Sequence, residues 1–290
     1  MQFNWMIDKR SAGLTIHEYL KQEKFSRRFL KTLKVNGGKV FVNDEISFFR
    51  YVLKEGEKLT LIAPNETRPK TLRPNRLELD IVYEDDAILI LNKQAGLPTI
   101  PSMRDGDYSL ANGILAYYDD KNLPYTIHVV TRLDRDTSGL VLIAKHSHSH
   151  ALLAELQKNN KIKRIYTAFI EGHLKEVQGK ITFPIMRNPD SIIERMVHSN
   201  GQKAITHFAV KETYSTYSKV EVELETGRTH QIRVHFAHGG HALLGDDLYG
   251  KKHPFIQRQA LHCHHLAFTH PLTGIKMEFT ACLPEDMQQL

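Results

Sequence analysis

The chain has 290 residues, enough for one large domain or two smaller ones, and its 41% apolar content supports an ordinary core. No run of about 18 apolar residues occurs and the first residues lack a signal-peptide pattern, so we expect a protein without a membrane anchor. Two cysteines, Cys263 and Cys282, give no disulfide framework, which predicts a cytoplasmic location.

The net charge of +6 is concentrated near the start of the chain. Residues 1–78 hold 16 Lys and Arg against 9 Asp and Glu, whereas residues 79–290 hold 23 against 24. This excess predicts a polyanionic partner for the first quarter of the chain, and nucleic acid is the commonest polyanion. A solvated basic face without a partner explains the charge alone equally well.

Residues 1–63 have the pattern of a small α/β domain. Helical spacing predicts helices over 14–20 and 26–33, and strands are expected over 39–44 and 59–62, each after a glycine turn. The second helix carries basic residues whose spacing places three on one face, which suits contacts with phosphates. These candidate RNA-binding residues are Arg27, Arg28, Lys31 and Lys34.

Residues 64–78 contain three prolines, which predicts an extended linker and a domain boundary before the second domain, residues 79–290. In that domain, helices are expected over 108–118, 147–158 and within 227–237. Strands are expected in 79–97 (two, around an acidic turn), 140–144, 164–171, 180–184, 203–214, 219–225 and 259–268. Long strands with scattered helices predict an α+β fold, with a mixed, largely antiparallel sheet and flanking helices.

The loop before the apolar strand 140–144 is crowded with charge. Four charged residues fall within five positions, and they are Arg132, Asp134, Arg135 and Asp136. A carboxylate that enters a sheet is partly desolvated, and an arginine beside it favours its charged form, in which it can act as nucleophile or base. Asp136 with Thr137 and Ser138 has the pattern of a capped turn. A surface loop of salt bridges is the simpler interpretation of all four charges.

A second polar cluster lies between residues 224 and 250, where glycines are frequent. Its donor-rich residues are Arg228, His230, Gln231 and Arg233. If residues 229–237 are helical, His230 and Arg233 share one face. The alternative is a glycine-rich connection whose polar side chains satisfy the loop backbone.

Tyr166 lies on the strand expected over 164–171, with Ile165 and Thr167 facing the other way. A tyrosine in a strand is usually a packing residue. Its hydroxyl can instead form a hydrogen bond in a site, and its ring can stack on a base.

Two histidine runs raise the question of a metal site. Their members are His146, His148 and His150, and then His262, His264 and His265. A zinc site needs three or four converging ligands, and neither run has paired CxxC or HxxxH spacing. We therefore expect no metal site.

The charged loop, the strand with Tyr166 and the polar cluster of residues 224–250 occur in the order found in RluA/RluD-type pseudouridine synthases. The chain resembles this family over residues 79 to about 283. Thr131–Gly139 is similar to the motif His-Arg-Leu-Asp-x-x-Thr-Ser-Gly, and Lys163 or Arg164 with Tyr166–Ala168 to Lys-x-Tyr-x-Ala. Two further segments match, Gly227–His235 to Gly-Arg-Thr-His-Gln-Ile-Arg-x-His and Gly245–Gly250 to Gly-Asp-x-x-Tyr-Gly. Residues 10–62 resemble an S4-type RNA-binding domain.

The resemblance implies an enzyme that isomerises uridine in RNA to pseudouridine without cofactor or metal. Asp134 would be the catalytic carboxylate and would pair with Arg233, while Tyr166 would stack on the uracil or assist proton loss at C5. Arg132 would fill the space left by the target base or hold phosphate. The RNA-binding set would also include Arg228, His230 and Gln231.

Ribosomal RNA is the expected substrate, with transfer RNA as the alternative, and we expect a monomer without an obligate protein partner. Two residues depart from the family pattern: Thr131 replaces the usual His, and Gln94 replaces the Pro after the Lys. Thr131 adjoins the catalytic loop, which makes it a candidate for altered substrate contacts. A non-catalytic RNA-binding or ribosome-assembly factor on the same fold and a histidine-rich metallohydrolase are the competing hypotheses.

Overall fold

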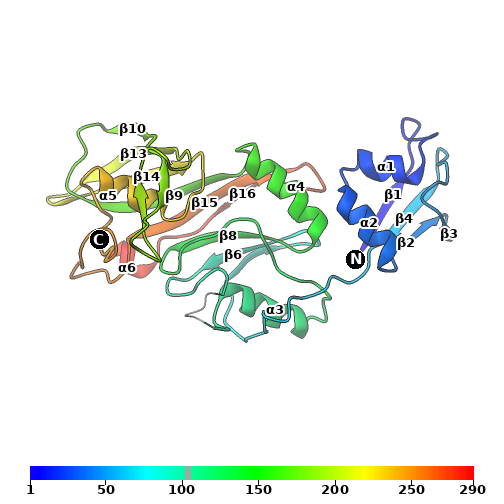
Figure 1. The fold of residues 1–290 in the computed structure, drawn as a ribbon, viewed down its shortest axis with the longest axis horizontal. Coiled ribbons are helices and arrows are strands. Elements are labelled where there is room, and N and C mark those ends of the chain that lie inside the picture. The colour runs from blue at the N-terminus through cyan, green and yellow to red at the C-terminus, as the bar shows by residue number, and fades with distance from the viewer. Residues whose placement is uncertain (102–105) are drawn as a thin grey trace.

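The computed structural model describes residues 1–101 and 106–290. The chain forms a small N-terminal sheet with two helices and a long sheet with its own helices (Figure 1). The N-terminal sheet lies at one end of the molecule beside α4, whereas α5 and α6 lie towards the other end. Within the described ranges every helix is too short or too polar to cross a lipid bilayer.

The N-terminal sheet is antiparallel, with the strand order β1-β4-β2-β3. Its elements are β1 (Gln2–Met6), α1 (Ile16–Gln22), α2 (Arg27–Val35), β2 (Lys39–Val42), β3 (Glu45–Ser47) and β4 (Lys58–Ile62). Ser26 caps α2, since its side chain accepts a hydrogen bond from the Phe29 backbone N–H at 3.1 Å. Both predicted helices and both predicted strands are present, whereas β1 and β3 were missed.

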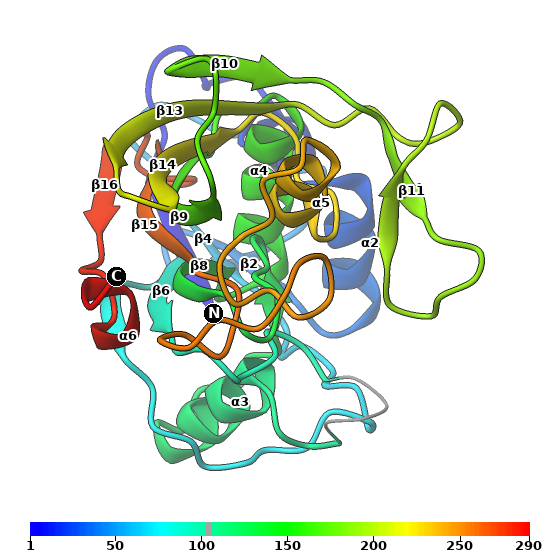
Figure 2. The same ribbon diagram turned by 90° about the vertical axis from the view of Figure 1, so that its left-hand side faces the viewer.

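The long sheet is mixed and largely antiparallel, so the predicted α+β fold is confirmed. Its strands are β5 (Ile81–Glu84), β6 (Ile88–Lys93), β7 (His128–Val129), β8 (Ser138–Ala144), β9 (Lys163–Glu171), β10 (Gln178–Ile181), β13 (Thr206–Thr213), β14 (Tyr217–Leu224), β15 (Leu261–Thr269) and β16 (Lys276–Thr280). Its helices are α3 (Leu110–Asp120), α4 (Ser147–Lys158), α5 (Gln231–His238) and α6 (Glu285–Gln288). The hairpin β11 (Ile185–Arg187) and β12 (Arg195–Val197) stands apart beside α5 (Figure 2).

Strand β8 begins at Ser138, so the turn expected over Asp136, Thr137 and Ser138 is wrong at Ser138. All seven residues of β8 are buried, and Gly139 pairs with Cys263 of β15 in parallel. Gly139 has φ +115°, and a Cβ there would lie 2.3 Å from the Cys263 carbonyl oxygen. Only glycine fits at this position, and it brings the charged loop before β8 against β15.

The segment 64–78 is extended, but it is fastened along α3 rather than free. Arg68 donates hydrogen bonds to the carbonyl oxygens of Tyr125 and Leu123, at 2.7 and 3.1 Å. Asn112 donates from Nδ2 to the Arg73 carbonyl oxygen at 2.7 Å. These contacts fix the chain between the two sheets.

The N-terminal sheet docks on the start of α4 through aromatic rings. The Phe25 and His148 rings stack with centroids 3.7 Å apart, and the edge of Phe3 meets His146 and His148. Glu66 accepts a hydrogen bond from the Ser147 backbone N–H at 2.9 Å. Burial lowers the pKa of His148 to about 4 and that of His146 to about 3, so both rings are neutral at pH 7.

These histidines predict acid sensitivity of the folded chain. Their pKa values are lower in the folded state than the usual 6.5. Their contribution to the free energy of unfolding is therefore fully present above pH 6.5 and is lost as the pH drops towards 4. His148→Phe keeps a ring on Phe25 but removes one titrating group, and we expect it to reduce the loss of stability between pH 7 and 4.5 by roughly 2–3 kcal/mol. Urea unfolding at both pH values measures this. The exposed His173 supplies the control, His173→Phe, which should keep the wild-type pH dependence; an unchanged dependence in His148→Phe would contradict the assignment.

Candidate active site

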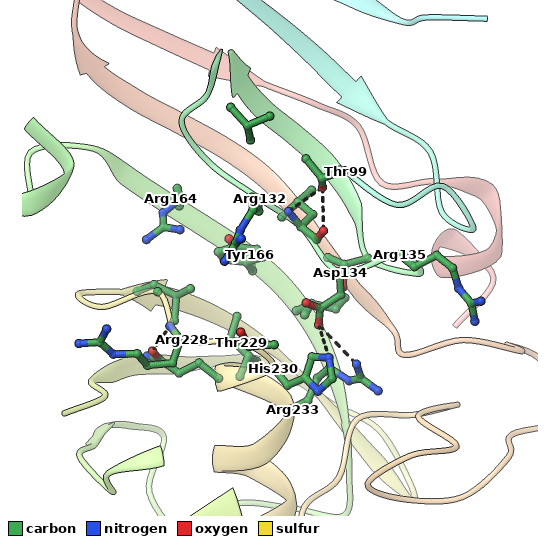
Figure 3. A pocket seen from close by; sticks show the side chains of 18 of the residues that line it. Thr99, Arg132, Asp134, Arg135, Arg164, Tyr166, Arg228, Thr229, His230 and Arg233 are labelled. Carbon is green, nitrogen blue, oxygen red and sulfur yellow. Dashed lines mark hydrogen bonds and ion pairs between the residues drawn. The ribbon is translucent and has the colours of Figure 1, made fainter. Parts of the chain in front are cut away.

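A cavity of about 670 Å³ opens where the loop before β8, strand β9 and the loop before α5 meet. A cavity of this size accommodates a nucleoside-sized group. It is lined by most of the residues singled out from the sequence, namely Arg132, Asp134, Arg135, Tyr166, Arg228, His230, Gln231 and Arg233. Figure 3 shows Asp134, His230 and Arg233 meeting at one end of this cavity.

Asp134 presents its carboxylate to the cavity, with 26% of the side chain exposed. Its Oδ2 atom lies 3.4 Å from Nη1 of Arg233 and 3.9 Å from Nε2 of His230. The two acids of the charged loop therefore have different partners, because Asp136 pairs with the exposed Arg135 at 3.2 Å instead of capping the turn. Arg135 and Asp136 form the surface salt bridge expected within the loop, whereas Asp134 pairs with Arg233, outside the loop.

Arg233 is held mainly by Asp246, which the sequence analysis had not assigned a role. Nε and Nη2 of Arg233 donate to the two oxygens of Asp246 at 2.7 and 2.8 Å, and Asp246 is fully buried. Burial opposes the charge of Arg233, but the hydrogen bonds and negative charge of Asp246 outweigh it and raise the pKa of Arg233. Nη1 is left free to face Asp134.

His230 lies just outside the helix, so the expected helical i, i+3 relation with Arg233 is wrong. Helix α5 begins at Gln231, and His230 has φ +56° in the left-handed region. Its Nδ1 atom is 2.8 Å from the Tyr249 hydroxyl. Burial lowers the pKa of His230, although the negative charge of Asp134 opposes the shift, so a neutral ring faces the carboxylate at pH 7.

Tyr166 is buried in β9 and lines the cavity. Burial raises the pKa of Tyr166, so its hydroxyl stays protonated at neutral pH. Thr167 faces the other side of the sheet, where its hydroxyl is 3.0 Å from Nδ1 of His264. The expected alternation along this strand is confirmed, and it directs Tyr166 and Arg164 towards the cavity.

Gln231 has both ends of its amide engaged within the protein. Its Nε2 atom donates to the Ile205 carbonyl oxygen at 2.9 Å, and its Oε1 atom accepts from the Arg228 backbone N–H at 3.0 Å. Gln231 therefore holds the loop that precedes α5 and also lines the cavity. The side chains of Arg132 and Arg228 remain exposed at the rim of the cavity.

Thr131 and the basic residues of α2 do not line the cavity. Thr131 is 1% exposed, and its hydroxyl accepts a hydrogen bond from the Leu142 backbone N–H at 2.9 Å. The expected change in substrate contacts at Thr131 is therefore not supported. The side chains of Arg27, Arg28, Lys31 and Lys34 lie on the separate N-terminal helix.

The backbone of the charged loop is clamped from one side by Lys93. This lysine is 1% exposed and donates to the carbonyl oxygens of Arg135, Leu97 and Gln94, at 2.9, 2.7 and 2.8 Å. Burial lowers the pKa of Lys93 to about 7, against the opposing charges of Asp136 and Asp134. Only the ammonium form supplies all three protons. The sequence had marked Lys93 only as part of an opening strand.

The other side of the loop is held by residues near the C-terminus. Arg258 donates from Nη1 to the Asp136 carbonyl oxygen at 3.1 Å and pairs with Asp286 of α6 at 2.7 Å. Gln259 donates to the Thr137 hydroxyl at 3.1 Å. Only these distant contacts reveal Arg258 and Gln259, because nothing in their local sequence marks them.

The histidine runs serve structural contacts. His146 caps α4, and Nδ1 of His262 lies 2.9 Å from the Ser138 hydroxyl. Among residues 1–101 and 106–290, no three side chains of His, Cys, Asp or Glu gather as metal ligands.

The sequence model described as RNA pseudouridylate synthase matches residues 87–238, which include Asp134, Tyr166 and Arg233. The chain is also 47% identical over 277 residues to the uncharacterized RNA pseudouridine synthase YjbO of Bacillus subtilis (strain 168), covering 96% of this chain and 98% of that protein. The chain belongs to the RNA pseudouridylate synthase family. This confirms the resemblance found in the sequence, and the family's enzymes are isomerases.

Further members of the family are similar over most of the chain. Ribosomal large subunit pseudouridine synthase D of Escherichia coli (strain K12) is 37% identical over 249 residues, covering 81% of this chain and 76% of that protein. Human RNA Pseudouridylate Synthase Domain Containing 1 superposes with a TM-score of 0.58 at 25% identity, covering 71% of this chain and 83% of that one.

The buried pair of Arg233 and Asp246 yields a stability prediction. Asp246→Asn leaves a buried guanidinium without its counter-charge, which costs roughly 3–5 kcal/mol in comparable cases. We expect the free energy of unfolding in urea to fall by about that amount. The adjacent Asp247 is exposed, so Asp247→Asn is the control and should change stability by less than about 0.5 kcal/mol. Equal effects of the two variants would show that the buried pair does not hold the site.

Proposed function

We propose that this chain converts uridine to pseudouridine in ribosomal RNA, with Asp134 as the catalytic carboxylate. The observation that carries the proposal is the partly exposed Asp134 side chain, which enters a nucleoside-sized cavity next to Arg233 and Tyr166. The other loop acid, Asp136, does not line the cavity and pairs with Arg135, which supports distinct roles for the two acids.

The reaction is an isomerisation that is balanced within one nucleotide. The N1–C1′ bond breaks, the uracil turns, C5 bonds to C1′, and one proton moves in net terms from C5 to N1. No electrons are gained or lost, so the chemistry requires only groups that hold the base and handle a proton. Asp134 has three routes open to it: attack on C1′, attack on the base, or removal of the C2′ proton.

The neighbours of Asp134 support its orientation in the cavity. Arg233, fixed by Asp246, places one guanidinium nitrogen 3.4 Å from the carboxylate. Tyr166 has a protonated hydroxyl and a ring that can stack on the uracil or assist proton loss at C5. A uridine must leave its stack to reach this cavity, and the exposed Arg132 at the rim can fill the vacated space or hold phosphate.

Ribosomal RNA is proposed as substrate because several relatives are named ribosomal large subunit pseudouridine synthase D. The N-terminal sheet domain, residues 1–63, is proposed to be an S4-type RNA-binding domain, with residues 64–78 joining it to the catalytic domain. Its basic helix α2 supports phosphate contacts. We further propose a monomer that works in the cytoplasm, where its two free cysteines stay reduced.

The function is tested by mapping pseudouridines in total RNA from cells with and without the gene, using carbodiimide modification and primer extension. We expect at least one ribosomal RNA position to lose its pseudouridine in the deletion strain and regain it on complementation. A full set of pseudouridines in the deletion strain would instead favour a non-catalytic RNA-binding role.

Asp134→Asn should lower turnover by roughly 100- to 10,000-fold, because an amide cannot act as base or nucleophile. Tritium release from [5-³H]uridine-labelled ribosomal RNA measures turnover, and a filter-binding assay should show retained RNA affinity. Asp136→Asn is the matched control and should stay within a few-fold of wild type. Wild-type turnover in Asp134→Asn would disprove the catalytic assignment.

Removing charge from α2 should weaken RNA binding and flatten its salt dependence. The triple variant Arg27→Gln, Lys31→Gln, Lys34→Gln removes up to three phosphate contacts. The slope of log affinity against log salt should therefore fall by about 2–3. A second triple variant, Lys121→Gln, Lys175→Gln, Lys276→Gln, removes the same charge from exposed sites outside the N-terminal domain. Equal slopes in the two triple variants would refute a specific role for α2.

A further inference from the structure

Arg164 is a buried arginine in the wall of the active-site cavity. It lies two residues before Tyr166 on β9, so both side chains leave the same face of the strand. Arg164 is only 8% exposed, in contrast to the exposed Arg132 and Arg228 at the rim. In Figure 3, Arg164 and Arg228 lie at the end of the view away from Asp134, His230 and Arg233.

Within the described parts of the chain, no carboxylate pairs with the guanidinium of Arg164. The other well-buried arginines each have one, since Arg233 pairs with Asp246 and Arg258 with Asp286. Arg164 lacks such a carboxylate, and its buried Nε atom has no hydrogen-bond partner. An unpaired buried charge is strongly unfavourable, which indicates that an anion from outside the chain completes this site.

Gly227 leaves room for the guanidinium of Arg164. A Cβ atom at Gly227 would lie 3.1 and 3.2 Å from the two terminal nitrogens of Arg164. The plane of the guanidinium therefore lies close to bare backbone at the start of the loop that carries His230. A planar fork with donors available in a cavity wall matches the oxygens of a phosphate group.

We propose that Arg164 binds the RNA phosphodiester next to the nucleotide whose base reaches Asp134. This inference rests on the proposed function, because it takes the ligand of the cavity to be a uridine within RNA. Arg164 thereby becomes a positioning residue. It fixes the backbone at one end of the cavity, while Asp134 and Arg233 act at the other end.

The first test measures anion binding by the protein alone, with inorganic phosphate as probe. At equal ionic strength, ~100 mM phosphate should raise the Tm of the wild type by roughly 2–4 °C relative to chloride. Arg164→Gln should lose this gain, and its Tm in chloride should equal or exceed that of wild type, because an unpaired charge is removed. Arg187→Gln changes an exposed arginine outside the cavity and should keep the gain. A full gain in Arg164→Gln, or a large loss of its stability in chloride, would overturn the proposal.

The second test uses tritium release from [5-³H]uridine-labelled ribosomal RNA. Arg164→Gln should raise KM by about 10- to 100-fold with a smaller effect on kcat, and Arg164→Lys should recover part of the loss. The slope of log KM against log salt should fall by about 0.7, whereas a structural role would leave that slope unchanged. An unchanged KM with active wild type would overturn the assignment to RNA phosphate.

These tests also separate failure of this proposal from failure of the proposed function. A wild type that releases no tritium but is stabilised by phosphate through Arg164 would refute uridine isomerisation and retain an anion site for free phosphate. An active wild type whose phosphate response and KM are both independent of Arg164 would refute only the present inference.

Discussion

The arrangement of the active site depends on the buried pair of Arg233 and Asp246. Two hydrogen bonds join them, and Asp246 also accepts from the backbone N–H groups of Leu248 and Tyr249. A buried ion pair gives little net stability, because desolvation offsets most of the attraction. The effect of the pair is on geometry. It fixes the orientation of the Arg233 guanidinium, and the remaining nitrogen, Nη1, faces Asp134.

The backbone of the loop that carries Asp134 is held from two sides, whereas the Asp134 side chain faces the cavity. Lys93 and Thr99 bind its carbonyl oxygens from one side, and Arg258 binds it from the other. These contacts come from strands β6 and β15 and their flanking loops, which are far apart in the sequence. A carboxylate on such a loop needs little reorganisation when it meets a ligand, which is the general advantage of preorganised sites.

Charge is arranged on two scales in this molecule. At short range, several arginines surround the cavity into which Asp134 points. This arrangement suits a ligand with a negatively charged backbone. At long range, the basic helix α2 belongs to a domain that is docked on α4 by the stack of Phe25 on His148, with segment 64–78 fastened along α3. The docking gives the basic surface a fixed position relative to the cavity.

The sequence by itself determined the secondary structure of most long elements, the α+β class and the family, because period, capping and linked motifs are local signals. Helices α2 and α4 are examples. It also identified Asp134, Tyr166 and Arg233 as a group. Only the tertiary structure placed His230 outside α5 and disclosed Asp246, Lys93 and Arg258 as supports of the site. These features arise from burial and from pairing between distant segments, such as Gly139 with Cys263, and no local pattern records such contacts.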